Sequence, residues 1–163
     1  MLSAAPEWAS SGFTPSDQET AGMLQADSPA VLRHIDLYQD LIKRMASNSA
    51  ECKKWAIGLV SAILILVAEK GIGQAAALVI VPVVLFCFLD AYYLALEKQF
   101  IAANNHFLDQ LHRGELGLEA LYRVKVTGSL PQTFLDALLS WSVWPFYLGM
   151  LALVAFTRWW MPG

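Results

Sequence analysis

The chain has 163 residues, of which 56% are hydrophobic and only 15% are charged. Soluble domains average about 45–50% apolar and about 25% charged residues, so this composition favours a membrane protein of one domain. The formal net charge of −3 and the lack of a long basic tract argue against direct binding of nucleic acid. The two cysteines, Cys52 and Cys87, fit no disulfide framework and no zinc spacing.

Residues 1–27 are predicted to form an acidic disordered tail. The stretch is rich in Ser, Ala, Gly and Pro and has no Lys or Arg. Such a composition cannot bury enough apolar surface to fold. It also lacks the basic start and apolar core of a signal peptide, so none is expected.

Residues 28–113 are predicted to form a long helical hairpin. Ser28 followed by Pro29 is a helix start, and apolar residues then recur at helical spacing into an uncharged run. Gly71 and Gly73 mark the turn, and Gly114 is a natural stop for the second helix. We expect membrane crossings at about residues 55–69 and 74–95, with the rest of the hairpin extending as a cytoplasmic stalk.

Residues 114–133 are predicted to form a cytoplasmic connector with a short helix over 118–125. A third transmembrane helix is expected within residues 134–163, because Ala137–Phe156 is free of charge and long enough to span a bilayer. Pro145 is expected to kink this helix. The fold class is therefore an all-α membrane protein, a hairpin plus a third, C-terminal crossing.

The distribution of basic residues predicts the orientation. Lys and Arg concentrate before the first apolar run and between the second and third runs, whereas the other side would hold only Lys70 and Arg158. The positive-inside rule then places the N-terminus in the cytoplasm and the C-terminus outside. The predicted location is the bacterial inner (cytoplasmic) membrane.

Asp90 is an isolated carboxylate at the point where the second apolar run becomes polar. Antiparallel helices folded at the Gly71 turn bring together residues whose numbers add to roughly 143, because each residue rises about 1.5 Å. Asp90 then lies level with Lys53 and Lys54. Pairing with either lysine is one interpretation, and a pore-mouth or gating carboxylate is the other. The membrane-interface or pore-mouth candidates are Asn48, Lys53, Lys54, Asp90, Tyr92, Tyr93 and Glu97.

The sequence predicts no enzyme and no cofactor. His34 and His106 come within about a turn of each other in this alignment, but no metal-binding spacing accompanies them, so we expect ordinary surface or stalk histidines. No serine elbow, pair of catalytic carboxylates or redox motif is visible. The "GIGQ" turn lacks the ending of a phosphate-binding loop.

Two stretches carry a resemblance to known proteins. "IKRMASNSAECKKW" (Ile42–Trp55) and "FLDAYYLALEKQF" (Phe88–Phe100) resemble a group of small bacterial membrane proteins with the patterns RMA-x-NS…K-x-W and LD-x-YYL-x-x-E-x-x-F. The architecture is also similar to the SLATT-type helical-hairpin proteins of bacterial conflict systems. That resemblance implies a membrane effector in phage defence, acting by pore formation or membrane disruption. The third crossing and the acidic tail depart from a plain two-helix hairpin.

The sequence leaves two main functions open. One is an oligomeric inner-membrane effector in phage defence, for which pore formation is one mode of action. The alternative is a non-conducting membrane anchor or adaptor that recruits a soluble partner through its stalk or tail. A homo-oligomer is expected because small residues at Gly58, Ser61 and Ala62 let neighbouring helices approach closely. The expected partners are membrane lipids, further copies of the chain, and a soluble protein or a nucleotide-signal trigger.

Overall fold

The first element among the described residues is a single helix, α2 (Pro29–Lys70, 42 residues). The computed structural model describes residues 27–71, 73–124, 126 and 128–160, so the predicted acidic tail lies, apart from Asp27, outside the described residues. The Ser28 hydroxyl accepts a hydrogen bond from the backbone N–H of Val31 (3.3 Å) and Pro29 follows it, as predicted. The helix ends where Gly71 adopts φ +67°, a left-handed conformation that glycine takes without strain.

The second long helix, α3, occupies Ile80–His112 and is preceded by a 3₁₀ segment, η2 (Gly73–Val79). Pro82 explains part of this irregular start, because it has no N–H to donate to the carbonyl of Leu78. The α3 helix ends just before Gly114 (φ +70°), the stop that the sequence predicts. The short helix expected over 118–125 is reduced to one 3₁₀ turn, η3 (Leu118–Ala120).

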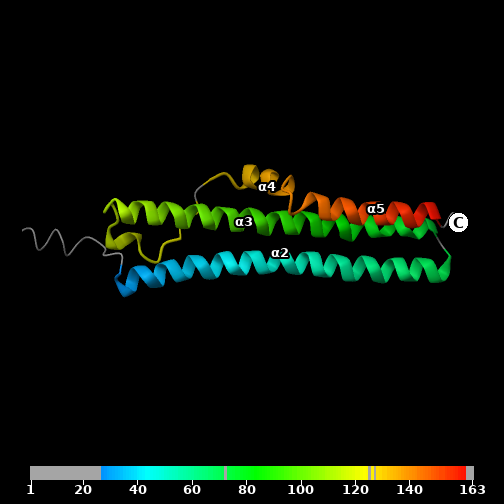
Figure 1. Cartoon of the computed structure of the whole chain (residues 1–163), viewed down its shortest axis with the longest axis horizontal. Coiled ribbons are helices and arrows are strands. Elements are labelled where there is room, and N and C mark those ends of the chain that lie inside the picture. Colours follow the sequence, from blue (N-terminus) through cyan, green and yellow to red (C-terminus); the bar gives the residue numbers. More distant parts are fainter. Residues whose placement is uncertain (1–26, 72, 125, 127, 161–163) are drawn as a thin grey trace, which may run out of the picture.

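The helices α2 and α3 pack along each other as an antiparallel hairpin (Figure 1), which confirms the predicted hairpin. Two apolar clusters hold it together. The larger lies toward the hairpin turn and includes Val60, Val67 and Val83, and the smaller lies at the open end and includes Tyr38 and Phe107. Between the two clusters α2 and α3 are joined by a buried ion pair.

The C-terminal part consists of two helices, α4 (Leu130–Leu138) and α5 (Trp144–Trp160). The prediction of a single third helix through Ala137–Phe156, kinked at Pro145, is therefore wrong. Pro145 lies in the first turn of α5, where its fixed φ and missing N–H are tolerated, so it begins a helix where a kink was expected. Figure 1 shows α5 running beside α3 to the same end of the molecule as the hairpin turn.

One stretch of the described residues, Ala75–His112, is long and apolar enough to cross a membrane by length and composition. The uncharged run of α2, between Lys54 and Glu69, is shorter, and α5 has only 17 residues. A full crossing takes about 20 residues. The coarse prediction of a helical membrane protein thus rests here on one membrane-length helix, while the three-crossing arrangement stays a prediction.

Candidate functional site: a buried ion pair between α2 and α3

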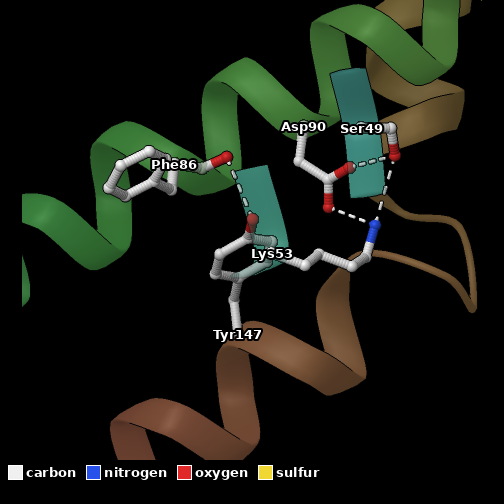
Figure 2. A network of polar contacts seen from close by, with 5 residues as sticks. All are labelled: Ser49, Lys53, Phe86, Asp90 and Tyr147. Atoms are coloured by element: carbon white, nitrogen blue, oxygen red, sulfur yellow. Dashed lines mark hydrogen bonds and ion pairs between the residues drawn. The ribbon is translucent and has the colours of Figure 1, made fainter. Parts of the chain in front are cut away.

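The candidate site forms where one turn of α2 faces α3. Ser49 and Lys53 are four residues apart, so their side chains lie one above the other on the same face of α2. Asp90 is the residue of α3 that faces them (Figure 2). The equal rise of the two helices from the Gly71 turn brings these residues to one level.

The three polar side chains form a closed set of contacts. The Ser49 hydroxyl donates a hydrogen bond to Asp90 Oδ1 (2.5 Å), and Lys53 Nζ lies 2.6 Å from Asp90 Oδ2. Lys53 Nζ also donates to Ser49 Oγ (3.3 Å). Both carboxylate oxygens therefore have partners, and the predicted pairing of Asp90 with one of the two lysines is confirmed for Lys53.

Tyr147 of α5 closes the site from the third side. Its ring is buried, and its hydroxyl donates to the backbone carbonyl of Phe86 (3.1 Å), one turn before Asp90 on α3 (Figure 2). This bond gives the polar end of a buried tyrosine its partner. It also ties α5 to α3 next to the ion pair, so all three long helices meet at this level.

Burial decides what the arrangement does chemically. The Asp90 side chain is 0% exposed and that of Lys53 is 22% exposed, so the carboxylate is enclosed within one protomer. Taking a charge out of water is costly, and removal of its partner leaves that cost uncompensated. An enclosed carboxylate with two satisfied oxygens fixes helix register, and it offers no surface to a permeating ion.

The other predicted site residues do not converge on Asp90. Lys54 lies on the exposed face of α2 and pairs with Glu51 (2.5 Å). Tyr92 is exposed and Tyr93 half-buried, with their rings edge to face at 5.9 Å. These residues lie at about the same level along the hairpin as Asp90. The side chains of Asn48 and Glu97 are both half-buried at neighbouring levels.

Two features were missed by sequence reasoning. Ser49 is absent from the predicted site residues, although its place four residues before Lys53 puts both on one helix face. His34 was expected to be an ordinary surface or stalk histidine, yet it is 0% exposed. His34 is buried because the segment after α3 folds back over it. No local pattern in the sequence predicts this contact.

Comparison with protein-family models, with curated proteins and with solved structures found no match to this chain.

Proposed function

We propose that this protein is a non-conducting membrane anchor or adaptor that holds a helical stalk at the cytoplasmic face of the inner membrane. The main observation behind the proposal is that the exposed surface of its apolar segments carries almost no polar side chains. Among residues 55–68, 75–91 and 144–157, all of them described, Ser61 is the only exposed residue with a polar, non-aromatic side chain. An aqueous path needs a polar or charged lining, and copies of this surface brought together would supply none.

The exposed apolar side chains fit a lipid environment. In water, contiguous apolar patches of more than a few hundred Å² are rare on monomeric proteins. Here large apolar residues are exposed along α2, η2, α3 and α5 toward the hairpin turn. They include Ile57, Leu59, Ile65, Leu66, Leu78, Ile80, Val81, Val84, Leu85, Leu148, Leu153 and Phe156. Lipid tails would cover these surfaces on all sides of the three helices.

Aromatic residues sit at both ends of this apolar region. Trp141 is 83% exposed at the start of α5, and Trp159 and Trp160 are 75% and 71% exposed at its end. Tryptophans gather at the two interfaces of a bilayer, where an amphipathic ring is half solvated. This pattern supports three crossings, with α5 parallel to α2 and the C-terminus outside.

The stalk is the part available to a soluble partner. Residues 29–48 of α2 extend beyond the ion pair by roughly 30 Å at the rise of an α-helix, alongside the end of α3. Half of the charged residues of α2 lie in this segment, and all of them are exposed: Arg33, Asp36, Asp40, Lys43 and Arg44. We propose that the partner is a protein that binds this rod.

A conducting effector is the function that the experiment must separate from the anchor. Purified protein would be reconstituted into liposomes loaded with a self-quenching dye, and its oligomeric state would be measured in nanodiscs by mass photometry. We expect an integral protein, resistant to alkaline carbonate extraction, that releases no dye. Dye release that Asp90→Asn abolishes without loss of folding would overturn the anchor and restore the pore-mouth role of Asp90. Extraction by carbonate would overturn membrane insertion itself.

A further inference from the structure

The segment after α3, residues 113–124, is called the connector from here on. It folds back between the ends of α2 and α3 at the tip of the stalk (Figure 1). Leu116 is buried there, and Leu121 and Val124 pack against the same cluster. Beneath it, the cluster residues of the two helices are Val31, Tyr38, Ala103, Phe107 and Leu111. The connector thus covers an apolar surface that the hairpin alone would leave open to water.

One part-buried hydrogen bond ties the connector to α2. The backbone N–H of Tyr122 donates to Nδ1 of His34 at 3.0 Å. The His34 ring is 0% exposed and packs on Phe107 (centroids 4.4 Å apart) and edge to face on Tyr38 (5.1 Å). Because Nδ1 accepts, the neutral ring carries its proton on Nε2, a buried atom without a hydrogen-bond partner among the described residues.

The surroundings of His34 do not favour a charged ring. The ionisable side chains whose rings contact His34 are Tyr38 on α2 and Tyr122 on the connector. His106 and Arg123 line a neighbouring pocket with Tyr38, and the connector carboxylates Glu115 and Glu119 are exposed. His34 makes no ion pair with a carboxylate of the described residues, and the nearby Asp36 and Asp109 are exposed. Burial therefore lowers the pKa of His34.

We propose that His34 is a proton-sensitive latch that holds the connector closed over the tip of the stalk. A protonated imidazole has N–H groups on both nitrogens. Its Nδ1–H would then face the N–H of Tyr122, donor against donor, within an apolar cluster. Protonation therefore converts the bond that closes the connector into a repulsion, and the connector releases.

Tyr122 makes the closed state easy to release. It adopts φ +62°, a left-handed conformation that is strained for a residue with a Cβ. The bond to His34 helps to hold this conformation, and an open connector is free to relax it. Release would expose the apolar cluster of the tip, so acidification on the stalk side would uncover a new surface. This latch does not depend on whether the stalk serves an anchor or a channel.

The test is hydrogen–deuterium exchange of the full-length protein in nanodiscs, at about pH 7.5 and about pH 5.5, on either side of the ordinary histidine pKa of about 6.5. Rates are normalised to the intrinsic exchange rate at each pH. We expect protection of the connector amides to fall about tenfold at the lower pH, because proton binding to a freed histidine one pH unit below its ordinary pKa favours the open state by about that factor. Peptides of α5 should keep their protection.

The decisive variant is His34→Asn, whose side-chain oxygen keeps an acceptor near the position of Nδ1 but does not titrate in this range. Its connector should stay protected at both pH values. The matched control is His106→Asn, an exposed histidine on α3 that should retain the wild-type pH response. Equal connector protection at both pH values in the wild type would overturn the proposal, as would an unchanged pH response in His34→Asn.

A second measurement covers the case in which His34→Asn does not fold. The ring nitrogens of His34 in the wild-type protein can be followed by NMR during a pH titration. The latch requires the Nε2–H tautomer at neutral pH, and a midpoint that coincides with the loss of Tyr122 amide protection. An Nδ1–H tautomer, or two separate midpoints, would refute it.

Discussion

Lys53 Nζ lies 2.6 Å from Asp90 Oδ2, so the two longest helices are joined by opposite charges across the interior of the hairpin. Ser49 completes the set through the second carboxylate oxygen. The pair stands at the boundary between the apolar half of the hairpin and its polar stalk. It is the point from which most of the molecule's testable properties follow.

Removal of either charge should destabilise the hairpin, and removal of Lys53 should do so more. Lys53→Gln leaves a fully buried carboxylate without its cation, at a cost of about 3–5 kcal/mol. Asp90→Asn should cost less, because the Lys53 ammonium can still reach water. Unfolding in mild detergent, followed by circular dichroism, measures both. Lys54→Gln is the control, since its exposed pair with Glu51 should contribute less than about 1 kcal/mol.

A charge exchange tests whether the effect is pairwise. Lys53→Glu combined with Asp90→Lys should be more stable than either single change, because opposite charges again face each other. The same exchange made with Lys54 should recover nothing. Equal recovery from both exchanges would show that the pair acts through general charge at this level and that the specific contact contributes little.

The bond from Tyr147 to α3 should anchor α5. Tyr147→Phe keeps the ring and removes the hydroxyl that donates to Phe86, so we expect a loss of about 1 kcal/mol. The effect should appear as faster proteolysis of α5 in detergent. Tyr92→Phe makes the same chemical change on an exposed ring and should leave the proteolysis rate unaltered.

The C-terminus should lie on the opposite side of the membrane from the stalk. Figure 1 shows α5 ending beside the hairpin turn, and by the positive-inside rule we expect the stalk in the cytoplasm. A C-terminal alkaline phosphatase fusion should be active, and a C-terminal GFP fusion should be dark. The reverse pair of results would mean that the number of crossings is even.

Two glycines of the connector, Gly114 and Gly117, should respond differently to replacement by alanine. Gly114 has φ +70°, so Gly114→Ala should cost about 1–2 kcal/mol of strain even though its added Cβ meets open space. In Gly117→Ala the added Cβ meets only the Glu119 side chain, at ordinary contact distances of 3.6–3.9 Å. The midpoint temperature of thermal unfolding should therefore fall in Gly114→Ala and stay close to the wild-type value in Gly117→Ala.

The level of Asp90 opposite Lys53 could be predicted from the sequence because it depends only on the position of the turn and on the equal rise of two helices. Which lysine faces inward could not, since that depends on the rotation of α2. The sequence also could not show whether Pro145 kinks one helix or begins a new one, because proline is compatible with both arrangements. The burial of His34 requires a connector that is distant in sequence, and such contacts have no local pattern.

The enclosed ion pair also limits how the protein can move. If α2 slid along α3 by one turn, about 5.4 Å, Ser49 and Lys53 could not both stay opposite Asp90: one would take the other's place, and the buried carboxylate would lose one of its two partners. Sliding of α2 along α3 by a turn is therefore unfavourable. A signal received at the tip would therefore reach the hairpin turn by tilting or turning of the rod as a unit, with the two helices locked in register.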